Sequence, residues 1–188
     1  MTLQTVSVDA NGFRAALGNF ASSVNVITMT DDDGRPLGMT ATAFSSVSID
    51  PLLILVCINR STRTYQHIAA RRVFGVNILG AVARDISDYC ARAGADKNLD
   101  PRWLVQHSQW RAPALGGALA FLDCEVEQDI PAGTHAVLIG AVRGIGLNPA
   151  ASAHEPLVYF QGEYRPLLNR MRYPKPDDLP VLLADHFS

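Results

Sequence analysis

The chain is 188 residues long, of which 48% are hydrophobic and 18% charged, a balance that indicates one globular domain and not a disordered chain. Its 16 Lys and Arg against 18 Asp and Glu leave a net charge of −2, with no basic run longer than Arg71-Arg72. A nucleic-acid partner requires a clustered basic face, so we expect none.

A membrane location is not expected either. The longest apolar run, residues 52–58, is far too short to cross a bilayer, and the first residues lack the charged-then-apolar pattern of a signal peptide. Cys57, Cys90 and Cys124 are an odd number of cysteines without CxxC spacing, which is typical of buried free thiols. These features favour a reducing, cytoplasmic compartment.

The first half of the chain predicts one helix followed mainly by strands. Asp9 is a candidate cap for a helix in which Phe13, Leu17 and Phe20 recur at helical spacing. The following segments are expected: a strand at 24–30, a turn at 31–34, an extended segment at 37–49, a strand at 52–58 that is apolar on both faces, and a helix at 61–70.

The second half continues with strands joined by short connections. We expect a strand at 74–78, a helix around 86–93, a loop at 94–110, and strands at 122–126, 136–147 and 157–164. This order lacks the regular strand–helix alternation of a doubly wound sheet, so it predicts a mainly β, antiparallel barrel with a few peripheral helices. We expect residues 1–165 to form this domain and residues 166–188 to form a proline-containing arm.

Several common catalytic and nucleotide-binding motifs are absent. Gly144-Ile145-Gly146 is followed by Pro149 where a dinucleotide-binding fingerprint has its third glycine, and there is no P-loop, GxSxG or HExxH. The five histidines are scattered, without paired ligand spacing, so no metal site is predicted.

Residues 38–51 are rich in Ser, Thr and Ala, and small side chains let a flat ring approach the backbone closely. Backbone N–H groups between Thr40 and Ser46 are candidate donors to a ring that gathers negative charge when it is reduced. The alternative is an ordinary strand rich in Ser and Thr.

Residues 59–64, Asn-Arg-Ser-Thr-Arg-Thr, stand at the start of the predicted helix at 61–70. Hydroxyls, unpaired N–H groups, the helix dipole and two arginines converge there, which is typical of an anion site. The alternative is simple capping of the helix by Ser61. With the Ser/Thr-rich segment one strand away, the pattern favours a ligand that has a flat ring and a phosphate.

These motifs resemble those of the flavin reductases, split-barrel flavoproteins that serve two-component flavin monooxygenases. The resemblance rests on residues 40–52, Thr-Ala-Thr-Ala-Phe-Ser-Ser-Val-Ser-Ile-Asp-Pro-Leu, on the Ser-Thr pair at 61–62, and on Val-Asn-Ile-Leu at 76–79. It continues through 120–126 and the closing Pro-Leu-Val-Tyr-Phe-Gln-Gly-Glu-Tyr at 156–164, in family order.

The resemblance implies an FMN-binding split barrel that reduces FMN, or alternatively FAD, with NADH or NADPH. It implies a homodimer, a diffusible flavin and a partner monooxygenase, with hydride transfer between stacked rings and no catalytic side chain. The flavin-binding residues that it implies are Met39, Thr40, Ala41, Thr42, Ser45, Ser46, Cys57, Ile58, Asn59, Ser61, Thr62 and Leu79.

The same resemblance implies that His135 and Tyr164 contact the nicotinamide. Two residues depart from the family pattern: Thr134 stands where relatives carry the Asp of Gly-Asp-His, and Thr42 replaces an Asn. Without that aspartate the imidazole loses a group that could orient it. The alternative for His135 is a residue at the start of a strand with no ligand role.

Two rival interpretations remain. A flavin carrier or redox sensor on the same barrel would bind the cofactor without catalysing its reduction. A pyridoxamine-phosphate-oxidase-like enzyme would share the barrel, but the motif block differs from that expected for one.

Overall fold

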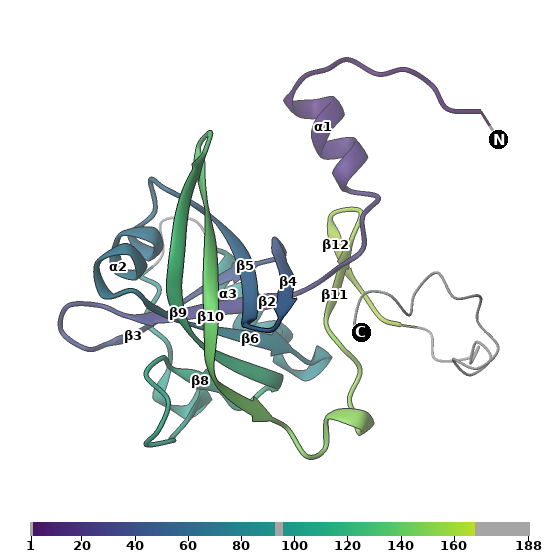
Figure 1. Cartoon of the computed structure of the whole chain (residues 1–188). Coiled ribbons are helices and arrows are strands. Elements are labelled where there is room, and N and C mark those ends of the chain that lie inside the picture. The colour runs from purple at the N-terminus through teal and green to yellow at the C-terminus, as the bar shows by residue number, and fades with distance from the viewer. Residues whose placement is uncertain (1, 93–95, 168–188) are drawn as a thin grey trace.

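The computed structural model describes residues 2–92 and 96–167, and it is built around one antiparallel sheet (Figure 1). The sheet has seven strands in the order β3-β2-β6-β9-β10-β5-β4. Their bounds are β2 (Asn25–Thr30), β3 (Pro36–Ala41), β4 (Phe44–Ile49), β5 (Leu52–Asn59), β6 (Val73–Leu79), β9 (Ala118–Ala132) and β10 (His135–Leu147). The predicted mainly β, antiparallel architecture is confirmed.

The two edge strands explain why the sheet curls. β3 and β4 occupy opposite edges of the sheet, yet only Thr42 and Ala43 separate them along the chain. A link of this length reaches about 11 Å at most, so the two edges must approach one another. The edges do not pair, and the result is a barrel that is split between β3 and β4.

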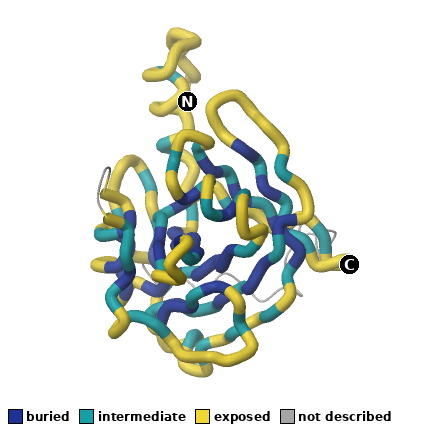
Figure 2. Tube along the Cα trace, turned by 90° about the vertical axis from the view of Figure 1, so that its left-hand side faces the viewer, coloured by how far each residue is buried: buried dark blue, intermediate teal, exposed yellow. Residues whose placement is uncertain are grey.

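The interior of this barrel is a continuous apolar core. On β5 the side chains of Ile54, Val56 and Ile58 are buried, whereas the intervening Leu53, Leu55 and Cys57 are half-buried. Because these half-buried side chains are apolar too, the prediction of a strand that is apolar on both faces is confirmed. Along the chain, buried residues gather inside the molecule and exposed ones in its outer loops (Figure 2). Gly140 is required in β10, because a Cβ there would lie 2.6 Å from Cζ of Phe74.

In the described part of the chain, three α-helices lie at the periphery: α1 (Ala10–Leu17), α2 (Arg63–Arg71) and α3 (Arg84–Ala91). The Asp9 carboxylate accepts from the N–H groups of Asn11 and Gly12, which confirms the predicted cap of α1. This helix has no buried residue and projects away from the barrel (Figure 1). In contrast, α3 buries Ile86 and Cys90 in a second apolar cluster.

The remaining described elements are short. They are β1 (Ser22–Ser23), β7 (Leu104–Val105), β8 (Ala114–Leu115), β11 (Val158–Phe160), β12 (Glu163–Arg165) and three 3₁₀ turns, η1 (Ala81–Ala83), η2 (Pro101–Trp103) and η3 (Ala151–Ala153). β1, β11 and β12 form a small separate sheet.

Three element predictions need correction. The segment 37–49 is not one strand. β3 ends at Ala41, Thr42 and Ala43 connect it to the opposite edge of the sheet, and β4 begins there at Phe44. The expected last strand at 157–164 is a hairpin, since Gln161 and Gly162 adopt positive φ angles of 51° and 84° between β11 and β12. The predicted loop at 94–110 contains η2 and β7 in its described part. The arm predicted at 166–188 lies almost wholly outside the described residues.

All three cysteines are free thiols, and Cys90 and Cys124 are buried as predicted, whereas Cys57 is only half-buried. Burial raises the pKa of the Cys90 and Cys124 thiols to about 12, so both stay protonated at neutral pH. Among the described residues, none of the helices has the length and apolar character needed to cross a membrane.

Candidate functional site

The open edge of the barrel carries the Ser- and Thr-rich segment. The Cys57 N–H donates to the carbonyl of Ala43 at 3.1 Å, and antiparallel alternation then turns the backbone of Ser45 towards β5. The backbone groups of Ser46 consequently face the open edge. Thr42, Ser45 and Ser46 are exposed, and the Ser45 hydroxyl donates to the Ser46 carbonyl at 3.1 Å. The ring-binding surface predicted here is therefore open to a ligand.

The turn before α2 is an organised polar loop. The N–H and the hydroxyl of Ser61 each donate to Oδ1 of Asn59 at 2.9 Å. Thr62 Oγ1 donates to the Asn59 carbonyl at 2.7 Å and accepts from the Tyr65 N–H at 3.2 Å. Thr62 therefore caps the helix, which begins at Arg63. The expected helix start at 61, with Ser61 as the alternative cap, is wrong.

This turn retains the features of an anion site. The first N–H groups of a helix have no partner within it, so those of Arg63 and Thr64 point out of the amino terminus of α2. Arg60 and Arg63 bring two positive charges to the same turn, and both are exposed. Because the hydroxyl protons of Ser61 and Thr62 are already used within the turn, these backbone N–H groups and guanidinium groups are the donors left for a phosphate.

His135 lies beside this turn. It opens β10 directly opposite Asn59, and the Arg60 N–H donates to the Thr134 carbonyl at 3.1 Å. The Thr134 hydroxyl lies 2.9 Å from Nδ1 of His135. A threonine hydroxyl thus takes the orienting place that the family pattern gives to an aspartate, without adding a negative charge.

A hollow of about 800 Å³ opens where β3 ends. Thr40, Ala41 and Thr42 form one wall, and Tyr159, Gly162, Glu163 and Tyr164 of the β11–β12 hairpin form the opposite wall. Val24, Arg84, Asp88 and Ala91 complete the lining. The hollow therefore brings the predicted ring-binding residues Thr40–Thr42 next to the predicted nicotinamide residue Tyr164.

A chain of hydrogen bonds joins the two walls. Thr40 Oγ1 donates to the Ser87 carbonyl at 2.7 Å, and the Ser87 hydroxyl lies 2.8 Å from the Tyr164 hydroxyl. Burial raises the pKa of the Tyr164 phenol, the bond to Ser87 opposes this shift, and the nearby Asp88 carboxylate raises the pKa again. The phenol therefore stays protonated at neutral pH.

The structure does not support every predicted binding residue. Ile58 and Leu79 have no exposed surface, because their side chains fill the two apolar clusters. Leu79 also uses both backbone groups, donating to Val24 and accepting from Leu157. Neither residue has an atom to offer a ligand in this structure. Met39 is half-buried against the main core.

The two predicted nicotinamide residues are also separated, since His135 does not line the hollow that contains Tyr164. Sequence reasoning missed Arg84, Ser87 and Asp88 of α3. The helical spacing of Ile86 and Cys90 was the available signal, because it places these three polar residues on a helix, but it could not show which face meets β3.

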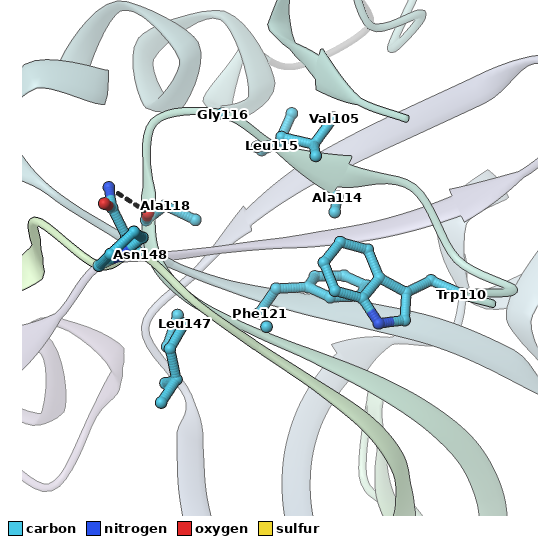
Figure 3. A pocket seen from close by; sticks show the side chains of 12 residues that line it. Val105, Trp110, Ala114, Leu115, Gly116, Ala118, Phe121, Leu147 and Asn148 are labelled. Carbon is cyan, nitrogen blue, oxygen red and sulfur yellow. Dashed lines mark hydrogen bonds between the residues drawn. The ribbon is translucent and has the colours of Figure 1, made fainter. Parts of the chain in front are cut away.

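A second hollow, of about 280 Å³, is aromatic and contains none of the predicted site residues (Figure 3). Trp110 packs against Phe121 there, with ring centroids 4.8 Å apart, and Leu147 and Asn148 lie across from them. The buried Asp123 carboxylate accepts from the N–H groups of Arg111 and Ala112, and it thereby fixes the segment that carries Trp110.

The polar edge and the larger hollow fit a ligand that combines a flat ring with a phosphate. Small side chains at Ala41 and Ala43 permit close approach to the backbone, and exposed N–H and hydroxyl groups at Thr42 and Ser46 can face an electron-rich ring edge. The amino terminus of α2 supplies the anion donors one strand away.

Comparison with known proteins decides the family. The flavin reductase like domain matches residues 17–168. The chain belongs to the flavin reductase family. It is 38% identical over 151 residues to the reductase component of a flavin-dependent trigonelline monooxygenase from Acinetobacter baylyi, covering 80% of this chain and 47% of that protein. It is 34% identical to the reductase component of a 4-nitrophenol monooxygenase from Rhodococcus opacus, covering 84% of this chain and 80% of that protein.

The chain spans about half the length of some curated relatives, 47% of the Acinetobacter protein and 45% of a probable flavin reductase of Rhizobium meliloti. Solved structures of flavin reductases match over nearly their whole length. Flavin reductase PheA2 aligns with a TM-score of 0.74 at 34% identity, covering 85% of this chain and 99% of that one. A nitrilotriacetate monooxygenase component B homologue from Mycobacterium thermoresistibile aligns at 0.79 and 30% identity, covering 94% and 98%. These matches confirm the split-barrel fold.

Proposed function

We propose that this flavin reductase transfers a hydride from NADH or NADPH to FMN or FAD and supplies the reduced flavin to a partner monooxygenase. One observation carries the proposal: Thr40–Thr42 belong at once to the polar open edge and to the hollow that ends at Tyr164. A ring lying on the edge and a second ring lying in the hollow would meet at these residues. Stacked rings are the arrangement that hydride transfer requires.

A bound flavin supplies the hydride-accepting ring, which no side chain of the protein can replace. The backbone donors at Thr42 and Ser46 stabilise negative charge on the reduced ring. The turn at residues 59–64 holds the phosphate. Cys57 of β5 lies between this turn and the open edge that holds the ring. The proposed flavin-binding set is Met39, Thr40, Ala41, Thr42, Ser45, Ser46, Cys57, Asn59, Ser61 and Thr62, without the enclosed Ile58 and Leu79.

The electron donor, NADH or NADPH, binds against the wall of the hollow that the β11–β12 hairpin forms. Tyr164 faces the hollow with a protonated phenol, and Arg84 brings a positive charge to the same space. His135 stands at the phosphate end of the edge, outside this hollow, and its contact with the nicotinamide stays a prediction. These side chains place the two rings and need not move a proton during the transfer.

The proposal includes three partners: a second copy of this chain, diffusible flavin and a monooxygenase component. The printed names of the relatives, reductase components of trigonelline and nitrophenol monooxygenases, support the last of these. Exposed apolar residues on β4 and β5 support the homodimer. The three free cysteines support a reducing, cytoplasmic compartment.

The test is a spectrum of the flavin-loaded protein before and after addition of NADH without oxygen. Without oxygen, the flavin absorbance is expected to bleach after NADH is added, within the time of one catalytic turnover. In air, the steady-state rate of NADH oxidation is expected to rise with the concentration of added FMN or FAD and then to saturate. An unchanged spectrum would favour the flavin carrier or redox sensor instead. A steady-state rate that ignores added flavin would contradict diffusible flavin and indicate a tightly held cofactor.

A further inference from the structure

Ser87 of α3 is a fully buried polar residue. It belongs neither to the apolar core nor to the flavin edge, the name used below for the open edge of the barrel at residues 40–46. Its carbonyl accepts from the Thr40 hydroxyl at 2.7 Å, and its own hydroxyl meets that of Tyr164 at 2.8 Å. A buried hydroxyl is costly unless it is paired, so this bond specifies where the Tyr164 phenol lies. Ser87 thereby connects the wall formed by β3 with the wall formed by the β11–β12 hairpin.

Tyr164 in turn supports a positive charge. The Arg84 guanidinium lies over its ring, 5.1 Å from the centroid. Arg84 is the one Lys or Arg among the described residues that line the hollow. Its pairing with Asp88, at 3.7 Å and with both side chains at least half exposed, is weak and can yield to a better anion.

The backbone of the hairpin is anchored by pairing of β11 with β1 and by the Gln161 N–H, which donates to the Gly18 carbonyl at 2.9 Å. Edge-to-face packing of Tyr159 on Tyr164, with centroids 5.6 Å apart, is internal to the hairpin. The backbone bonds from Val24 to Leu157 and from Leu157 to Leu79 hold the residue just before β11. The hairpin backbone is therefore held by β1 and Gly18, whereas the bond to Ser87 ties the Tyr164 side chain to α3 and fixes where its phenol lies.

We propose that Ser87 is a positioning residue for the electron donor: it fixes Tyr164, and with it Arg84, as the wall that receives the nicotinamide ring and pyrophosphate of a pyridine dinucleotide. The inference rests on the proposed function and deepens it. The size of the hollow, about 800 Å³, suits a ligand of this class, and the single guanidinium suits its pyrophosphate. The flavin edge does not depend on Ser87 beyond the Thr40 bond to its backbone carbonyl, which a side-chain substitution retains.

The experiment compares Ser87→Ala and Tyr164→Phe with the parent enzyme and with Tyr89→Phe. The Tyr89 hydroxyl, on the same helix, donates to the carbonyls of Asp96 and Asn98 at 2.8 Å and does not line the hollow. Tyr89→Phe therefore matches the loss of a bonded hydroxyl on α3 without touching the proposed wall. Tyr164→Phe removes the same bond from its accessible side, should Ser87→Ala fold poorly.

Ser87→Ala and Tyr164→Phe are each expected to raise KM for NADH about fivefold, with kcat and flavin affinity within about twofold of the parent. The double variant is expected to be no worse than either single one, because both remove one bond. Tyr89→Phe is expected to lower the melting temperature and leave KM for NADH unchanged.

Binding of NAD⁺ to the flavin-free variants, measured by calorimetry, separates this inference from the proposed function. If the parent reduces flavin but both variants keep its KM and its NAD⁺ affinity, Ser87 is only structural and the inference fails. If the parent does not oxidise NADH with either flavin, the proposed function fails, and the NAD⁺ affinities still decide whether Ser87 positions a dinucleotide. Equal effects of Tyr89→Phe on KM would also overturn the inference.

Discussion

The imidazole of His135 is held by its neighbour in the chain. Thr134 offers an uncharged hydroxyl 2.9 Å from Nδ1, which leaves Nε2 free to point outward. An aspartate at position 134 would bring a negative charge to this hydrogen bond, whereas threonine can orient the ring through an uncharged group. The Thr134 substitution is thus compatible with a hydrogen-bonding role for His135, although it removes the electrostatic part of that role.

The first prediction concerns this residue. His135→Ala is expected to slow flavin reduction by NADH by up to about tenfold, because one neutral hydrogen bond to the nicotinamide carboxamide is lost. Flavin affinity is expected to stay nearly intact. Rapid mixing of the flavin-loaded variant with NADH measures the rate, and Thr134→Val, which retains the imidazole but removes its orienting hydroxyl, is expected to fall between the variant and the parent. A reduction rate equal to that of the parent at every NADH concentration would make His135 structural.

At the scale of elements, the turn that leads into α2 combines two tasks in two neighbouring hydroxyls. Thr62 caps the helix, and Ser61 closes the loop on the Asn59 amide. Only the structure separates these tasks, because from the sequence either hydroxyl could be the cap. A double substitution would mix the loss of a cap with the loss of ligand binding.

The second prediction therefore separates the two residues. Thr62→Ala is expected to lower the free energy of unfolding by about 1 kcal/mol, since Tyr65 loses its capping acceptor, whereas Thr62→Ser retains the cap and serves as control. Ser61→Ala is expected to change stability little and to weaken flavin binding by about fivefold, because a loosened turn holds the phosphate donors less well. Urea unfolding and flavin titration are the measurements. Unchanged flavin affinity in both alanine variants would show that the phosphate does not bind at this turn.

The elements also show where sequence reasoning ends. The apolar run of β5 and the Asp9 cap were predictable from local pattern, whereas a run that is apolar on both faces could not show which of its faces is buried. The break at Thr42 and Ala43 was not predictable, because neither residue is a turn former and the change of edge is imposed by closure of the sheet. The positive φ angles of Gln161 and Gly162 had a signal in the glycine. Ile58 and Leu79 resembled ligand contacts by motif, yet only the assembled core shows that they are enclosed.

At the scale of the whole molecule, the split barrel leaves apolar surface uncovered. Val47, Ile49 and Leu52 at the β4–β5 turn and Ile145 on β10 surround a hollow of about 310 Å³, and all four are exposed. Apolar patches of this kind usually meet another protein surface. β4 carries Val47 and Ile49 of this patch and also Ser45 and Ser46. A copy of the chain docked on the patch would therefore lie next to the flavin edge. This placement links oligomerisation to the site and supports a homodimer as the working form.

The last prediction tests that surface. Ile49, whose exposed fraction is 65%, lies at the centre of the proposed contact, so Ile49→Asp would bury an unpaired carboxylate in a dimer. We expect the parent to sediment as a dimer and the variant to raise the dimer dissociation constant about a hundredfold or more, giving monomers at micromolar concentration. Val82 is similarly exposed, at 69%, but lies on η1 outside this surface, so Val82→Asp is the matched control and is expected to stay dimeric. Analytical ultracentrifugation over a concentration series measures all three. A monomeric parent would contradict the homodimer itself, whereas a dimeric Ile49→Asp variant would place the interface elsewhere on the barrel.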